Sequence, residues 1–215
     1  MTPKQRKGPW HGRVAVLAAT LLIACTLAGC GFTVSGPKNA TQGSTMETTE
    51  FSRLDDAGVA QILASKSMRL DFRQGTIPKA EVGLPDSAYA PDVVAPTGDK
   101  FTLSVTGGSG TLNAQTDHVR FTTTDTSPDL DLVYYFLTTE SLDQYVQLVR
   151  DAVTDYGLNA DAANRWIDGA LKDPGKKSNY SLGDGNKLGF NVGYDLRYDG
   201  SKKTQVIIVT VSAAS

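Results

Sequence analysis

Cysteine and histidine are scarce in this chain, with two residues of each among 215. The cysteines, Cys25 and Cys30, both lie in the N-terminal region, so the sequence excludes a disulfide framework. His11 also lies in the N-terminal region, so a zinc site in the rest of the chain would have to be built from carboxylates and His118 alone. This excludes the usual zinc ligand sets. The chain also lacks a Gly-x-Ser-x-Gly motif, a glycine-rich phosphate loop and a dinucleotide fingerprint. These absences predict a protein that is not an enzyme and has no metal or cofactor.

Acidic residues are absent from the first 30 positions, while Lys4, Arg6, Lys7 and Arg13 precede an uncharged run from Val14 to Gly29. This run has sixteen residues, fewer than the ~20 needed to span a bilayer as a helix. A basic leader, an apolar run and small residues at its end are typical of a secretory signal peptide. An uncleaved membrane helix and a cytoplasmic core helix are the alternatives, and neither explains the basic leader together with the small residues.

The segment Leu27-Ala28-Gly29-Cys30, where this run ends, resembles the lipobox of bacterial lipoproteins. The resemblance is limited to this segment. It implies that the Cys30 sulfur receives a diacylglyceryl group, that residues 1–29 are removed, and that a further acyl chain such as palmitate is added to the new N-terminus. It also implies a lipid anchor in the cell membrane, with the rest of the chain on the extracytoplasmic side. Each buried methylene of the anchor contributes about 0.8 kcal/mol to membrane binding.

Removal of residues 1–29 takes away four basic residues and no acidic ones. Lys+Arg then falls from 21 to 17 against 23 Asp+Glu, a net charge of about −6. This charge argues against nucleic acid as a partner. Residues 30–50 contain Cys30 and a Thr-, Ser- and Gly-rich stretch with little apolar mass, which predicts a flexible tether. Residues 51–215 are then expected to form a single globular domain.

Three helices are expected in that domain. The first spans residues 52–65, with Ser52 as its cap. The second spans residues 141–156, begins with the capping box of Ser141 and Gln144, and is ended by Gly157. Residues 159–171 form the third helix, capped by Asn159. The short link between the second and third helices predicts a helix pair, and we expect Val149 and Trp166 to cover the sheet.

Alternating apolar residues predict strands near residues 68–72, 101–105, 119–125, 180–182 and 187–198. Near-continuous apolar runs predict two more strands, at 130–138 and 206–211. Residues 107–110, 183–186 and 199–200 are expected to be turns. Residues 75–99 contain four prolines, which excludes a helix or a central strand and leaves either a functional loop or one that wraps the surface. The predicted fold class is α+β, a mostly antiparallel curved sheet with a helix pair packed on one face.

Few residues suggest a site. His118, in a strand, is expected to face solvent. Gly107-Gly108-Ser109-Gly110 is better explained as a hairpin turn than as a nucleophile loop, and Asp125, Asp129 and Asp131, like Asp184 and Asn186, fit turns better than a calcium loop. The aromatic residues belong either to the core or to the lining of an apolar pocket. They are Tyr134, Tyr135, Phe136, Tyr145, Tyr156, Trp166 and Tyr194.

Three functions are open at this point. The first is a non-catalytic accessory or interaction lipoprotein of the cell envelope, with an envelope protein as partner. The second is a carrier that holds a lipid or another apolar solute between the helices and the sheet. The third is an enzyme whose carboxylates do acid–base chemistry. The sequence favours the first, since it offers an anchor and a tether but no catalytic set, and Cys30 is the single modification site that it predicts.

Overall fold

The computed structural model describes residues 50–214 of the chain. The signal peptide, Cys30 and most of the tether lie outside these residues, so their predictions stay predictions. No helix within the described part is long and apolar enough to cross a membrane.

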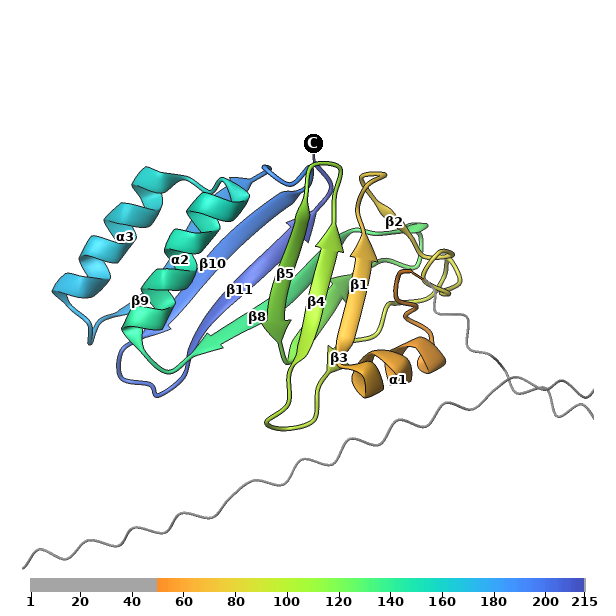
Figure 1. Ribbon diagram of the computed structural model, residues 1–215, viewed down its shortest axis with the longest axis horizontal. Helices are drawn as coiled ribbons and strands as arrows, with labels where there is room; N and C mark the ends of the chain where they lie inside the picture. The colour runs from red at the N-terminus through yellow and green to blue at the C-terminus, as the bar shows by residue number, and fades with distance from the viewer. Residues whose placement is uncertain (1–49, 215) are drawn as a thin grey trace, which may run out of the picture. The chain divides into compact units, whose positions relative to one another are not determined.

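The described part is an α+β domain built on a six-stranded antiparallel sheet (Figure 1). The strand order is β3-β6-β8-β11-β10-β9. Their bounds are β3 Val93–Val94, β6 His118–Thr122, β8 Leu132–Thr139, β9 Lys177–Gly185, β10 Asn191–Asp199 and β11 Gln205–Ser212. A register irregularity between Gly193 and Asp195 interrupts the pairing of β10 with β9, and such irregularities bend a sheet. The predicted fold class is confirmed.

One face of this sheet carries a second layer with two parts. The helices α2 Leu142–Tyr156 and α3 Ala160–Lys172 cover the β9–β10 side, and a three-stranded sheet covers the other side (Figure 1). That small sheet has the order β1-β4-β5, with β1 Ser67–Asp71 parallel to β4 Phe101–Thr106, and β5 Thr111–Thr116 antiparallel to β4. Helix α1 Asp56–Ser65 precedes β1, and β2 Ile77–Pro78 pairs with β7 Asp129–Leu130.

The helix pair forms as the sequence predicts. The Gln144 amide donates to the Ser141 hydroxyl at 3.2 Å, and Gly157 ends α2 in the left-handed conformation at φ 81°. Asn159 caps α3 by accepting a bond from the Ala162 amide at 2.8 Å. Val149 is fully buried and Trp166 is nearly so, which confirms that both side chains cover the sheet.

The space beneath the helix pair is filled. The Trp166 ring lies 5.2 Å from the Tyr145 ring and 5.9 Å from the Tyr198 ring, measured between centroids. The polar atoms of these rings have partners, since Tyr145 donates to the Val206 carbonyl and Tyr198 to the Pro174 carbonyl. Of the two alternatives that the sequence leaves open, the solid core holds beneath the helices.

The first helix begins later than predicted. Asp55, not Ser52, is its N-cap, and the Asp55 carboxylate accepts a bond from the Gly58 amide at 2.9 Å. Ser52 is used elsewhere, because its hydroxyl accepts a bond from the Arg69 amide at the start of the domain. The prediction of a Ser52 cap is therefore wrong.

The closing strands also differ from the prediction. The strand predicted at 187–198 begins only at Asn191, because residues 186–189 form a turn in which the Gly189 amide bonds to the Asn186 carbonyl at 3.1 Å. The turn predicted at 183–186 is wrong, since β9 runs through Gly185. The sequence pattern does not predict strand β5.

The proline-rich loop from 75 to 99 wraps the surface and contributes only short edge strands. The side chain of Lys79 is fully buried beneath it and donates to the Asp86 carbonyl at 2.6 Å and to the Thr124 carbonyl at 2.5 Å. The Ala90 amide donates to the Thr123 hydroxyl at 3.1 Å. A buried ammonium requires such acceptors, so these contacts hold the loop to the domain.

Two helical glycines should respond to substitution in opposite directions. A Cβ atom on Gly58 would lie 2.3 Å from the Arg53 carbonyl oxygen, whereas a Cβ on Gly169 would meet open space. We expect Gly58→Ala to destabilise the domain by about 1–3 kcal/mol through this clash. Gly169→Ala should stabilise it by up to about 1 kcal/mol, because alanine is the better helix former. Denaturant midpoints of the full chain check the pair, and a stabilised Gly58→Ala variant would contradict the close approach.

Candidate functional site

A groove of about 560 Å³ lies over the six-stranded sheet, between α2 and β5. Figure 1 shows these two elements side by side on the same face of the sheet. The floor comes from β8 and β10, one wall from α2 and the other from β5. Binding sites for small ligands commonly fall between about 300 and 1,000 Å³. The groove is therefore large enough to hold a ligand.

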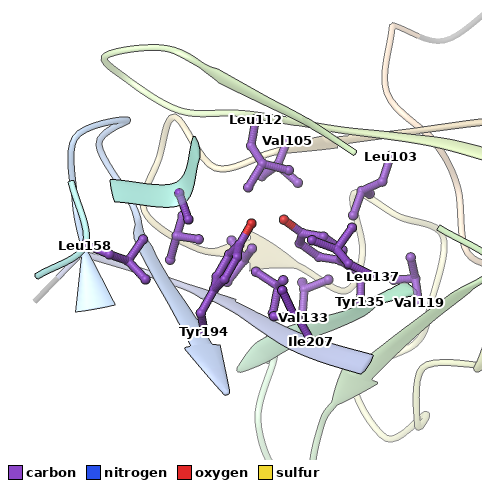
Figure 2. Close-up of a cluster of buried hydrophobic side chains, with 14 of the residues drawn as sticks. Leu103, Val105, Leu112, Val119, Val133, Tyr135, Leu137, Leu158, Tyr194 and Ile207 are labelled. Atoms are coloured by element: carbon purple, nitrogen blue, oxygen red, sulfur yellow. The ribbon is translucent and has the colours of Figure 1, made fainter. Parts of the chain in front are cut away.

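Three tyrosines from distant parts of the chain line the groove. Tyr135 comes from β8, Tyr156 from the last turn of α2, and Tyr194 from β10. The alternation of each strand turns Tyr135 and Tyr194 to the covered face of the sheet. Figure 2 shows their hydroxyl groups directed toward one another, with Leu112 above them.

The Tyr135 hydroxyl is the unusual feature of this floor. The residue is fully buried, and its hydroxyl has no hydrogen-bond partner among the described residues. A buried hydroxyl without a partner costs about 1–3 kcal/mol of folding free energy. The hydroxyl is also sealed from solvent, and the neighbouring Tyr194 and Tyr156 hydroxyls are close enough to act on it.

The electrostatics keep these hydroxyls neutral. Burial raises the pKa of Tyr135 well above its usual value, and the nearby Tyr194 and Tyr156 raise it further. Burial likewise raises the pKa of Tyr194 and of Tyr156. At neutral pH all three side chains are therefore protonated, and they present hydrogen-bonding hydroxyls rather than phenolates.

The α2 wall is acidic and rich in amides. Gln144, Gln147, Asp151 and Asp155 follow one another at helical spacing and line the groove. The Gln147 amide donates to the Asp151 carboxylate at 2.6 Å. On the opposite wall, Lys100 is the one charged residue among the described residues that line the groove, and its ammonium lies 3.3 Å from the Thr138 hydroxyl. The walls thus carry two carboxylates against one ammonium group.

The structure places His118 away from this groove. It begins β6, its ring stacks on Phe136 at 4.7 Å, and its Nε2 lies 3.4 Å from the Asp92 carboxylate. Arg120 donates to the same carboxylate at 2.9 Å and holds the pKa of Asp92 below its usual value, with a smaller contribution from His118. The ring is half-buried, so the prediction of a solvent-facing histidine holds only in part.

The other candidate residues lie in turns or at strand ends. The Gly107 amide bonds to the Gly110 carbonyl at 2.8 Å, which confirms the hairpin turn around Ser109. The Ser127 hydroxyl donates to Asp131 at 3.2 Å and to the Asp129 carbonyl at 3.1 Å. Asp184 lies in β9, and Asn186 lies in the turn that follows. Within residues 50–214, no three His, Cys, Asp or Glu side chains gather where they could hold a metal ion.

The aromatic residues divide between the two roles that the sequence left open. Tyr145 and Trp166 belong to the core beneath the helices, whereas Tyr135 and Tyr194 belong to the buried core and also form, with Tyr156, part of the groove lining. Tyr134 and Phe136 are half-buried and alternate with the floor residues along β8. The sequence placed all seven on apolar stripes and gave no signal for which of them would meet.

A smaller hollow of about 320 Å³ lies beside α3 and β9, next to Trp166 and Tyr198. Two of its aromatic groups are satisfied within the chain, since the Trp166 indole donates to the Ser178 hydroxyl at 3.1 Å and Tyr198 donates to the Pro174 carbonyl. It is smaller than the groove and lies on the other side of the helix pair's core.

Comparison of the chain with protein-family models, with curated proteins and with solved structures finds no match. A functional conclusion must therefore rest on the geometry of the groove and on the N-terminal sequence.

Proposed function

We propose that this chain is a lipid-anchored protein of the extracytoplasmic membrane face that binds a ligand or partner segment in the groove without transforming it. The observation that carries the binding role is the groove of about 560 Å³, which has a tyrosine-lined floor and polar side chains of α2 and β5 along its walls. The anchor rests on Leu27-Ala28-Gly29-Cys30 and on the leader that precedes it.

Binding suits the lining of the groove better than catalysis. The tyrosines are protonated, because burial raises the pKa of each. Neutral hydroxyls of this kind orient a ligand by hydrogen bonds but are poor bases and nucleophiles. The described residues that line the groove include no histidine and no cysteine. Asp151 is already paired with Gln147, which favours a role in recognition.

The second candidate, a carrier of an apolar solute, is favoured by the floor. Leu137, Leu148 and the tyrosine rings offer apolar surface at the base of the groove. The solid core beneath the helices leaves this groove as the place where such a solute would lie. A lipid recovered at near one-to-one stoichiometry from gently purified protein would favour the carrier over the interaction protein.

Cysteine protection in protoplasts tests the proposal. Gln144 is exposed at the groove, and Asp168 is exposed on α3 away from it. Gln144→Cys and Asp168→Cys variants are treated with a membrane-impermeant maleimide, first on protoplasts and then as purified protein. We expect Gln144→Cys to react several-fold more slowly in protoplasts than after purification, because a ligand covers it. Asp168→Cys should react at the same rate in both.

The unmodified chain is the control for the anchor. After removal of residues 1–29, Cys30 is its only cysteine, so a lipidated chain should take up no maleimide. Labelling of the parent chain would contradict the lipid anchor. Equal protection of both introduced cysteines, or of neither, would contradict a ligand in the groove.

A further inference from the structure

The free edge of β5 forms one wall of the groove. β5 pairs with β4 on one side and is the last strand of the small sheet. The Gly107 amide bonds to the Gly110 carbonyl at the hairpin. Gly107 and Gly110 form a hydrogen-bonded pair, and hydrogen-bonded and non-hydrogen-bonded pairs alternate along an antiparallel ladder. The N–H and C=O groups of Thr111, Asn113 and Gln115 therefore point away from β4.

These outward backbone groups have no partner within residues 50–214. Only the side chains of Asn113 and Gln115 are engaged, with Ser104 at 2.7 Å and Thr102 at 2.7 Å, on the outer face of the small sheet. The end of β5 is held in place, because the Thr116 hydroxyl donates to the Phe136 carbonyl of β8 at 2.9 Å. An open strand edge on a fixed support is the template for adding a strand.

We infer that the groove takes an extended peptide segment, which adds to β5 as a further strand and carries basic side chains toward α2. This inference rests on the groove being the binding site proposed above. The free edge of β5 supplies backbone hydrogen bonds, and Asp151 and Asp155 meet the basic side chains of the segment.

The spacing of an added strand fits these walls. Side chains of a strand point alternately to its two faces, so every second residue faces the floor and the others face the rim. A floor-facing threonine is small and has a high preference for strands. A rim-facing lysine is placed to meet the α2 carboxylates. The segment is therefore expected to alternate small β-forming residues with basic residues.

The probe is the peptide acetyl-(Thr-Lys)3-amide, and its counterpart is acetyl-(Thr-Glu)3-amide. Binding to the full-length protein in a nonionic detergent is measured by fluorescence anisotropy. We expect the lysine peptide to bind at least about tenfold more tightly, since like charges across an interface are strongly disfavoured. Asp151→Asn with Asp155→Asn should remove most of this difference.

A matched pair of variants isolates the backbone. Asn113→Pro removes the outward N–H at a strand edge, where proline is tolerated, while Asn113→Ala keeps it. The proline variant should lose about tenfold in affinity for the lysine peptide, and the alanine variant should bind as the parent does. Two further lysine peptides, N-methylated at every threonine or at every lysine, have the same charge. Alternate N–H groups of an added strand face β5, so one of these two peptides should fail to bind and the other should bind. This result does not depend on the Asn113 variants.

The outcomes separate this inference from the proposed function. Equal binding by both methylated peptides would overturn strand addition and leave a binding groove in place. A failure of every peptide to bind would overturn the inference, while cysteine protection at Gln144 reports independently on the groove. Self-association that Asn113→Pro abolishes would assign the edge to a second copy of this chain and overturn the peptide. Binding that begins only when residues 31–45 are deleted would assign the edge to this chain's own segment, with the same consequence.

Discussion

Trp166→Ala should lower the free energy of unfolding by about 3–5 kcal/mol, the usual loss for a buried aromatic side chain. The Trp166 ring is 7% exposed and touches the rings of Tyr145 and Tyr198. Its indole also donates to the Ser178 hydroxyl, which would be left without that partner. Denaturant unfolding of the full chain, followed by far-UV circular dichroism, measures the loss.

Leu171→Ala is the matched control on the same helix. Leu171 is 50% exposed, so its truncation should change the unfolding free energy by less than about 0.5 kcal/mol. Similar losses for the two variants would show that Trp166 lines an open space rather than a packed core. That result would favour a carrier that holds its solute beneath the helices.

Cys30→Ala should abolish lipid attachment completely. Without the thiol there is no acceptor for the diacylglyceryl group, and the lipobox resemblance then implies an uncut precursor. A single acyl chain binds membranes only reversibly, whereas two or three hold a protein firmly. We therefore expect the variant to keep residues 1–29, as intact-protein mass spectrometry would show, and to leave the detergent phase on partitioning.

Cys25→Ala provides the control for that experiment. Cys25 lies within the apolar run and leaves with the signal peptide, so its replacement should alter neither the mature mass nor the membrane retention. A Cys30→Ala protein with the normal mature mass and normal retention would contradict the lipoprotein proposal.

The fold class was predictable because its main elements carry strong local signals. The capping box of Ser141 and Gln144, with Gly157 at the C-terminal end, defines α2, and the alternation after Asn191 defines β10. The errors fall where tertiary contacts decide. Ser52 bonds to the Arg69 amide rather than capping a helix, and no local pattern near Ser52 reports on β1.

Strand β5 escaped prediction for a physical reason. Its sequence, TLNAQT, alternates only weakly, because one face carries Leu112, Ala114 and Thr116 and the other carries amides. Asn and Gln have little preference for strands, so the segment reads as a loop until β4 pairs with it. This polar character suits an edge strand, since it limits unwanted pairing with other chains.

The groove itself was beyond the reach of the sequence. Tyr135, Tyr156 and Tyr194 each fall on an apolar stripe, and the alternation of a strand tells which face is covered but not by what. Whether α2 and β5 meet above the sheet or leave a gap depends on contacts between elements far apart in the chain. For the same reason, the missing partner of Tyr135 is visible only in three dimensions.

Tyr135→Phe gives the most direct test that the floor of the groove holds a hydroxyl without a partner. In the purified chain, loss of a buried hydroxyl without a partner should leave the unfolding free energy unchanged or raise it by about 1 kcal/mol. Tyr145→Phe is the comparison, because it removes a hydroxyl that bonds to the Val206 carbonyl at 3.0 Å and should cost about 1 kcal/mol. Equal destabilisation by the two substitutions would contradict this account, because it would mean that the neighbouring tyrosine hydroxyls already satisfy the Tyr135 hydroxyl within the free protein.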